Sequence, residues 1–228
     1  RAIGDYDVDG ICSTFILKEG LSACGASVDS CIPDRMKDGY GLNERLVEQA
    51  AADGIRTIVT CDNGIAAAEQ IALAKERGMR VIVTDHHEVP YEEVPGENGG
   101  EPGKRYRLPP ADAVVDPKQP GCAYPFREIC GATVAFKLIQ ELFSGFGLAG
   151  LSSGKKEERG LLDELLELAA FATVCDVMPL RDENRILVRH GLSMMQDSQN
   201  QGLRALMEVS GDGLPRNRQK LTAFHIGF

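Results

Sequence analysis

Acidic residues recur in this sequence directly after short apolar runs, at points where a strand of a sheet would end. The residues concerned are Asp5, Asp7, Asp9, Asp62, Asp85 and Asp116. A single aspartate after a strand is commonly the N-cap of the next helix, and that explanation suffices for one isolated case. It does not suffice for the set, because carboxylates that converge on one pocket repel one another unless cations neutralise them. The pattern therefore predicts a site for divalent metals.

The chemistry of this set follows from its donor atoms. Two histidines, His86 and His87, follow Asp85 in the segment TDHH. Carboxylate oxygens with one or two imidazoles and no thiolate suit Mn²⁺ or Mg²⁺, so we expect manganese first and magnesium second. Two such ions that share a carboxylate activate a water molecule and stabilise an in-line displacement at phosphorus. Hydrolysis of a phosphate ester is the reaction that the pattern indicates.

The spacing within the first acidic segment, DYDVDG, gives its side chains a direction. In extended backbone, residues two apart point to the same side, so Asp7 and Asp9 would reach one cluster. Asp5 shares that side but lies deeper in the strand. We therefore expect Asp7 and Asp9 to be ligands, and Asp5 to be a supporting residue or a further ligand.

Apolar runs rich in Ile and Val alternate with helical patterns along the first half of the chain. The predicted strands are residues 1–4, 28–32, 57–61, 80–84 and 113–117, and the predicted helices are residues 10–24, 43–54 and 65–78. Such alternation predicts a doubly wound α/β fold, with a mainly parallel sheet and helices on both faces. In folds of this kind ligands bind outside the carboxyl ends of the strands, which is where the acidic residues fall.

Beyond residue 131 the strand signal fades and helical patterns with wide apolar faces follow. The predicted helices here are residues 131–143, 161–174 and 184–196, with a linker at 144–160. Residues 88–110 are dense in Pro, Gly and charge, and we expect a mobile flap or a disordered excursion there. We divide the chain into an α/β domain at 1–180 and a helical segment at 181–228. Because the chain starts without Met and ends in an apolar run, we expect that segment to lead to a second domain.

The composition excludes several classes of protein. The chain has 228 residues, 43% of them hydrophobic and 26% charged, and a formal net charge of -9. That charge argues against a protein whose whole surface binds nucleic acid, so a polyanion must be bound locally or through metals. No apolar stretch of the sequence approaches the roughly 20 residues of a membrane helix. The odd count of seven cysteines, without a CxxC pair, indicates reduced thiols and a cytoplasmic address.

Six segments occur in an order that is found in one family of enzymes. They are DYDVDG, DGYGL, DNGI, TDHH, GATVAF and ATVCDVMPL. In this order they resemble the DHH phosphoesterase family, and the resemblance extends to about residue 185. The resemblance implies a dinuclear metal site with the ligands Asp7, Asp9, Asp62, His86 and Asp176. Asp176 follows a helical pattern rather than a strand, so the resemblance alone nominates it.

The resemblance also implies roles for individual residues. Asp62 would bridge the two metals, and His87 would face the scissile phosphate as a donor that stabilises developing charge. Asp85 would orient the histidines from outside the set of ligands, or would itself be a further metal ligand. Arg35, in IPDRMKDGYGLN, matches a position that reaches a nucleic-acid phosphate, although an ordinary solvated arginine explains it equally well. Independently of the resemblance, Gly131 begins a predicted helix whose backbone N–H groups would hold a phosphate oxygen, although a tight helix start also explains this glycine.

Within the family, the segments IPDRMKDGYGLN and PLRDENR favour the single-strand-specific exonucleases. The implied function is metal-dependent hydrolysis of single-stranded DNA from its 5′ end in recombination and repair, with a helicase or a single-strand-binding protein as partner. One alternative is a phosphodiesterase for short oligonucleotides or cyclic dinucleotides, and another is a non-catalytic scaffold in a replication complex. Because such enzymes continue into a second domain that closes over the site, we expect this chain alone to hold metals but to be a weak nuclease.

Overall fold

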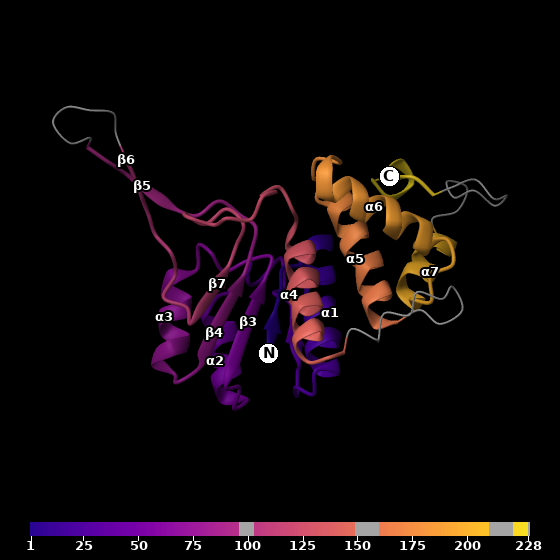
Figure 1. Cartoon of the computed structure of the whole chain (residues 1–228). Coiled ribbons are helices and arrows are strands. Elements are labelled where there is room, and N and C mark those ends of the chain that lie inside the picture. Colours follow the sequence, from indigo (N-terminus) through magenta and orange to yellow (C-terminus); the bar gives the residue numbers. More distant parts are fainter. Residues whose placement is uncertain (96–102, 149–159, 210–220, 228) are drawn as a thin grey trace.

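A computed structural model describes residues 1–95, 103–148, 160–209 and 221–227 of the chain. Its centre is a sheet of five parallel strands in the order β2-β1-β3-β4-β7 (Figure 1). The strands are β1 Ala2–Ile3, β2 Ser30–Cys31, β3 Thr57–Cys61, β4 Arg80–Thr84 and β7 Ala113–Val115. The predicted α/β class with a mainly parallel sheet is confirmed. β3 and β4 have the predicted bounds, whereas the other strands are shorter than predicted.

Two hydrophobic cores cover the two faces of this sheet. The helices on the first face are α1 Val8–Ala23 and α4 Gly131–Gly145, and those on the second are α2 Glu44–Ala52 and α3 Ala68–Glu76 (Figure 1). Strand β3 contributes to both cores because successive side chains point to opposite faces: Val59 lies in the first core and Ile58 in the second. Burial on both faces explains why the strands are near-continuous apolar runs in the sequence.

The strand order changes direction between β1 and β3. After β1 the chain passes through α1 to β2 on one side, and it then crosses to β3 on the other side of β1. The loops that leave β1 and β3 therefore diverge, and the space beyond their carboxyl ends is the usual ligand position in such sheets. Asp5 follows β1 and Asp62 follows β3 at this point.

Helices make up the rest of the described chain. They are α5 Leu161–Cys175, α6 Asp182–Met195, α7 Gln201–Val209 and α8 Ala223–Gly227. α5 packs against α1 and α4, and α6 packs against α5, so the helical part extends the first core (Figure 1). The last two helices have no counterpart among the predicted ones. Among the described helices, none combines the length and apolar character that crossing a bilayer requires.

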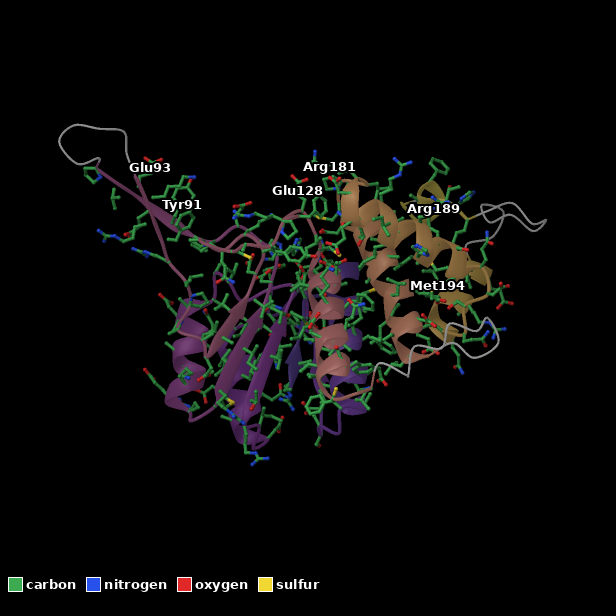
Figure 2. All side chains as sticks on the ribbon, viewed as in Figure 1. Tyr91, Glu93, Glu128, Arg181, Arg189 and Met194 are labelled. Carbon is green, nitrogen blue, oxygen red and sulfur yellow. The ribbon has the colours of Figure 1, made fainter. Side chains whose placement is uncertain are left out.

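The segment at 88–110 contains a structured hairpin. β5 Tyr91–Val94 and β6 Gly103–Tyr106 pair antiparallel and project away from the body of the molecule (Figure 1). Tyr91 and Glu93 lie on β5 (Figure 2). Tyr91 stands opposite Tyr106 and Glu93 opposite Lys104, and such cross-strand pairs stabilise a hairpin. The expectation of a disordered excursion is wrong for these two strands. The residues between them, and most of the predicted linker at 144–160, lie outside the described residues.

Candidate metal centre

The first acidic segment forms the start of a helix rather than extended backbone. Asp7 is the N-cap of α1, and its carboxylate accepts a hydrogen bond from the Gly10 N–H at 2.9 Å. Asp9 lies in the first turn of α1 and is buried. The geometric reason for pairing Asp7 with Asp9 is therefore wrong, because residues two apart on a helix do not share a face.

The N-terminus of α4 holds the Asp9 carboxylate. The backbone N–H groups of Gly131 and Ala132 donate to its two oxygens at 2.6 and 2.8 Å. These N–H groups and the positive end of the helix dipole stabilise a carboxylate that is removed from water. Because Asp9 occupies the N–H group of Gly131, the interpretation in which this group holds a substrate phosphate is wrong.

Asp62 follows β3 in the left-handed backbone conformation, with φ +60°, and its side chain is buried. Helix α4 approaches it so closely that a Cβ added to Gly131 would stand 2.6 Å from the Asp62 Cβ. Only glycine is compatible with that approach. Burial, together with the charges of Asp9 and Asp7, raises the pKa of Asp62 to about 11. In the folded chain without metals, the protonated form of Asp62 is therefore favoured over the charged carboxylate.

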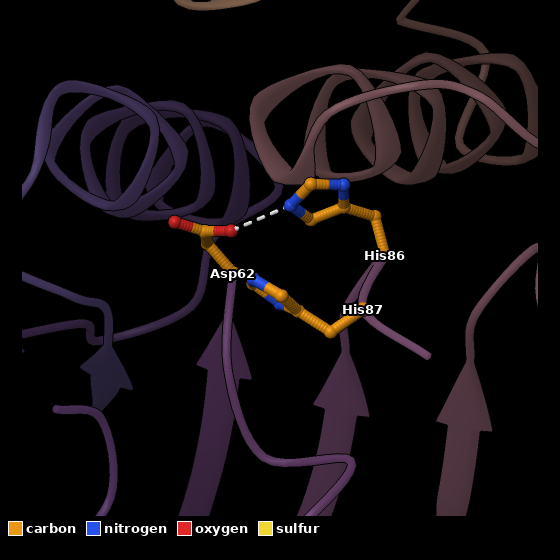
Figure 3. A group of neighbouring side chains, drawn as sticks. All are labelled: Asp62, His86 and His87. Atoms are coloured by element: carbon orange, nitrogen blue, oxygen red, sulfur yellow. Dashed lines mark ion pairs between the residues drawn. The ribbon is translucent and has the colours of Figure 1, made fainter. Parts of the chain in front are cut away.

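The imidazole of His86 faces three carboxylates. Its Nε2 lies 3.0 Å from Asp62 Oδ1 (Figure 3), 3.6 Å from Asp9 Oδ2 and 3.8 Å from Asp176 Oδ2. Burial lowers the pKa of His86, and a neutral imidazole is the form that binds metals. His86 belongs to two groups whose potential ligand atoms lie within 4.8 Å of one another: Asp9, His86 and Asp176 form one, and Asp62, His86 and His87 the other.

Asp176 reaches this cluster from the C-terminal end of a helix, whereas Asp9 lies at the N-terminal end of one. It is the C-cap of α5, and its side chain is 26% exposed. Burial, followed by the charges of Asp9 and Asp7, raises the pKa of Asp176 to about 6. The negative end of the helix dipole also disfavours a carboxylate at this position.

Four polar atoms of the cluster are buried without a hydrogen-bond partner in the described part of the chain. They are Asp62 Oδ1, Asp176 Oδ2 and the two ring nitrogens of His86, of which Nε2 faces the carboxylates. Buried polar atoms in native proteins almost always have a partner, so this convergence calls for a ligand that supplies one. Oxygen and imidazole donors without a thiolate fit Mn²⁺ or Mg²⁺. The residues present therefore fit the metals that the sequence predicts.

Asp85 and His87 form a hydrogen-bonded pair beside the cluster. His87 Nδ1 lies 2.7 Å from Asp85 Oδ1, which also accepts from the His86 N–H at 2.8 Å. The bond to Asp85 raises the pKa of His87 against the effect of burial. Burial by itself would raise the pKa of Asp85, but His87 and the backbone N–H groups lower it. The bond therefore favours the charged forms of both groups, and it lets Asp85 orient His87.

The comparison with known protein families agrees with this geometry. A family model described as the N-terminal domain of the DHH family matches residues 2–173. The chain belongs to the DHH family. Five of its six motifs lie within the matched residues, and the sixth, ATVCDVMPL, begins there.

Curated relatives of this DHH chain carry one name, the single-stranded-DNA-specific exonuclease RecJ. The protein of Bacillus subtilis is 40% identical over 98% of this chain and 25% of its own length. The protein of Escherichia coli is 37% identical over 99% of this chain and 36% of its own length. The DHH chain therefore spans a quarter to about a third of the relatives that it matches.

Solved structures extend the likeness to three dimensions. A crystal structure of exonuclease RecJ bound to manganese has a TM-score of 0.75 at 33% identity, and it covers 100% of this DHH chain and 50% of that chain. RecJ of Thermus thermophilus in complex with Mn²⁺ has a TM-score of 0.71 at 31% identity, over 100% of this chain and 28% of that one.

Four of the five ligands predicted for this DHH chain meet in the two groups of potential metal-binding residues; the fifth, Asp7, belongs to neither group. Its charge nevertheless raises the pKa values of Asp62 and Asp176, which places it near them. His87, predicted to be a substrate donor, lies within the second group. Arg35 is exposed, with its guanidinium 5.2 Å from the centre of the Tyr6 ring.

Two buried aspartates have other partners in this DHH chain. Asp5 Oδ1 accepts from the Gly41 N–H at 3.1 Å, and Asp116 Oδ1 accepts from the Lys118 N–H at 2.7 Å. Neither belongs to the two potential metal-binding groups found among the described residues. Tyr40 was not among the predicted site residues, yet its hydroxyl donates to the Asp62 carbonyl oxygen at 2.6 Å. Its place in the motif DGYGL was the available signal.

Proposed function

We propose that this chain carries the catalytic metal site of an exonuclease that hydrolyses single-stranded DNA. The observation that supports this proposal most directly is the convergence of Asp62 Oδ1, His86 Nε2 and Asp176 Oδ2. These atoms are buried and lack hydrogen-bond partners among the described residues. The names of the relatives supply the substrate class, and their 35–40% identity to nearly all of this chain supports carrying it over.

The proposed metal set is two divalent cations, with Mn²⁺ preferred and Mg²⁺ as the alternative. The proposed ligands are Asp7, Asp9, Asp62, His86 and Asp176. By the family resemblance Asp62 would be a ligand shared by both ions, and its Oδ1 lies 3.0 Å from His86 Nε2. When bound, the ions would lower the pKa of a water molecule and neutralise charge on the phosphate.

The remaining roles are performed by side chains of the chain itself. A protonated His87 donates from Nδ1 to Asp85 and is proposed to offer its other N–H to a phosphate oxygen, where negative charge develops during hydrolysis. Asp85 keeps the ring in this orientation and favours its charged form. Arg35 is proposed to bind a backbone phosphate further along the strand, which its exposure permits.

The wider setting is also part of the proposal. We infer 5′ to 3′ digestion in recombination and repair, a cytoplasmic location, and cooperation with a helicase or a single-strand-binding protein, all from the similarity to RecJ proteins. All seven cysteines are free thiols, which suits a reducing compartment. The proposed division into a catalytic domain at 1–180 and a helical segment at 181–228 is supported by a family match that ends at residue 173.

The test compares wild type with Asp62→Ala on a 5′-labelled single strand, a dinucleotide and a cyclic dinucleotide, each with Mn²⁺. We expect the long strand to be hydrolysed best and the variant to be slower by more than about 100-fold, since loss of outer partners of a metal site alone costs about 10–100-fold. The exposed Asp197→Ala is the matched control. Undiminished turnover in Asp62→Ala contradicts the site, and preference for either dinucleotide contradicts the substrate.

A further inference from the structure

Tyr40 lies between the two parts of the site. Its hydroxyl donates to the Asp62 carbonyl oxygen at 2.6 Å. The hydroxyl oxygen also lies 3.4 and 3.3 Å from the two ring nitrogens of His87. The rings of Tyr40 and His87 meet edge to face, with centres 5.7 Å apart and an angle of 82°. One side chain thus contacts both a metal-cluster residue and the proposed phosphate donor.

The loop that carries Tyr40 is attached to the ends of two strands. The N–H of Gly41 donates to Asp5, which follows β1, and the N–H of Leu42 donates to Asn63 Oδ1 at 3.2 Å. Asn63 in turn donates to the carbonyl oxygens of Ile3 and Cys61 at 3.1 and 2.8 Å. These buried bonds hold the loop against the carboxyl ends of β1 and β3, so the sheet itself determines where Tyr40 lies.

The contact with Asp62 falls on an unusual stretch of backbone. Asp62 has a φ of +60°, which residues with a Cβ rarely adopt unless their surroundings hold them there. Its N–H donates to the Thr84 carbonyl at 3.1 Å, and its carbonyl accepts from Tyr40. The peptide groups on both sides of the Asp62 side chain are therefore anchored, one by β4 and the other by Tyr40.

The ring of His87, whose side chain is 46% exposed, is contacted by Tyr40 and by two further residues. Asp85 binds the Nδ1 edge at 2.7 Å, and the ring of His86 lies tilted on it with centres 4.4 Å apart. Because the hydroxyl hydrogen of Tyr40 is directed to the Asp62 carbonyl, the hydroxyl cannot rotate away without losing that bond. Tyr40 therefore limits the orientations that His87 can adopt.

We propose that Tyr40 is a positioning residue that acts through Asp62 and His87. Its hydroxyl holds the Asp62 backbone in the conformation that directs the carboxylate toward His86, and its ring keeps His87 in the orientation set by Asp85. This inference rests on the proposed hydrolytic function for its kinetic part, whereas its effect on metal binding is independent of any reaction.

Two substitutions separate the contribution of the hydroxyl from that of the ring. Tyr40→Phe removes only the hydroxyl, so we expect Mn²⁺ affinity to fall about tenfold, the scale of effect for support groups around metal ligands. Tyr40→Leu removes the ring as well, and kcat should fall at least a further tenfold, with KM within about twofold of wild type because Tyr40 acts through other residues. Tyr106→Phe, a half-exposed tyrosine on the hairpin, is the matched control and should match wild type.

Mn²⁺ affinity is measured by titration calorimetry. Turnover is measured with bis(p-nitrophenyl) phosphate, a small diester whose binding does not require a long DNA groove. Thermal unfolding of each metal-free variant shows whether it folds. The inference is overturned if Tyr40→Phe binds Mn²⁺ as wild type does, or if Tyr40→Leu raises KM with unchanged kcat. If wild type binds Mn²⁺ but hydrolyses neither this diester nor DNA, the proposed function fails, and calorimetry on Tyr40→Phe still decides the inference.

Discussion

Individual residues of the site fall into two electrostatic kinds. Asp62 and Asp176 have pKa values raised by burial and by neighbouring carboxylates, so their charged forms are disfavoured in the metal-free chain. Asp85 and His87 compensate each other through a bond of 2.7 Å. The first kind stabilises a bound cation at the expense of the metal-free fold, and in the second kind each charge favours the other.

We expect the metal-free chain to lose stability as pH rises above about 4. The pKa values of Asp62 and Asp176 are raised from 3.8 to about 11 and about 6, so the folded state binds these protons more tightly than the unfolded state. Their contribution to the free energy of unfolding is therefore full below pH 3.8 and is lost as pH rises, up to about 6 for Asp176 and further for Asp62. Urea unfolding at several pH values, with and without Mn²⁺, measures the slope.

Asp62→Asn tests the origin of that slope. The neutral amide has no charge to bury, so the metal-free variant should be more stable than wild type near pH 7 by about 1 kcal/mol or more, or roughly 2–4 °C in Tm for a chain of this size. Its pH slope should be flatter, and Mn²⁺ should stabilise it less. Glu69→Gln, on the exposed side of α3, should keep the wild-type slope. An unchanged slope in Asp62→Asn contradicts the assignment.

At the scale of elements, three helix ends meet at the metal centre. The N-terminus of α1 presents Asp7 and Asp9, the N-terminus of α4 neutralises Asp9, and the C-terminus of α5 presents Asp176. The segment after α5 is tied to the segment before α4, because Arg181 pairs with Glu128 at 2.6 Å (Figure 2). The helices that carry the ligands are therefore connected to one another directly, and bound metals are not their sole link.

Gly131→Ala should disturb this arrangement at its tightest point. The new methyl group would stand 2.6 Å from the Asp62 Cβ and 2.9 Å from its Cα, so either α4 or Asp62 must shift. We expect a loss of about 1–3 kcal/mol in stability, as for other overpacked sites, and weaker Mn²⁺ binding. Gly145→Ala, at the other end of α4 with open space around it, should gain up to about 1 kcal/mol instead. Equal effects of the two variants would refute the close-approach argument.

At the scale of the whole molecule, the ligands come from both halves of the chain. Helix α1 supplies Asp9, the loops that follow β3 and β4 supply Asp62 and His86, and the helical part supplies Asp176. The full sequence has a net charge of -9, so its general field repels DNA, and attraction must come from bound cations and from local groups such as Arg35. This charge distribution alone is not expected to bind a long DNA strand tightly.

We therefore expect this chain to bind Mn²⁺ yet to degrade single-stranded DNA at least about tenfold more slowly than the RecJ protein of Bacillus subtilis, of which it matches 25%. Repulsion between the acidic surface and DNA, which salt screens, is the physical reason. The two proteins are compared on the same 5′-labelled strand at low and high salt, with calorimetry to verify that Mn²⁺ is bound. An equal rate would contradict this prediction, because it would show that this chain binds DNA sufficiently by itself.

Several features follow from the sequence because they depend on neighbouring residues. The Ile- and Val-rich runs of β3 and β4 predicted strands with the observed bounds, since burial on both faces leaves a continuous apolar run. The donor types in DYDVDG, CDNGI and TDHH predicted a cluster of oxygen and imidazole atoms, and such a cluster is present. Both conclusions require only that strands end where their apolar residues end.

Other features were decided by the tertiary structure. Asp9 is stabilised by N–H groups 122 and 123 positions away, and Asp176 joins His86 through the packing of α5, so no local period reveals either contact. The direction of Asp7 and Asp9 was misjudged because α1 begins between them. Residue types and periodicity therefore determined which atoms are available and which edge of the sheet they occupy. The long crossovers of the chain decided which of those atoms meet, because only folding brings carboxylates from distant segments close enough to require a shared cation.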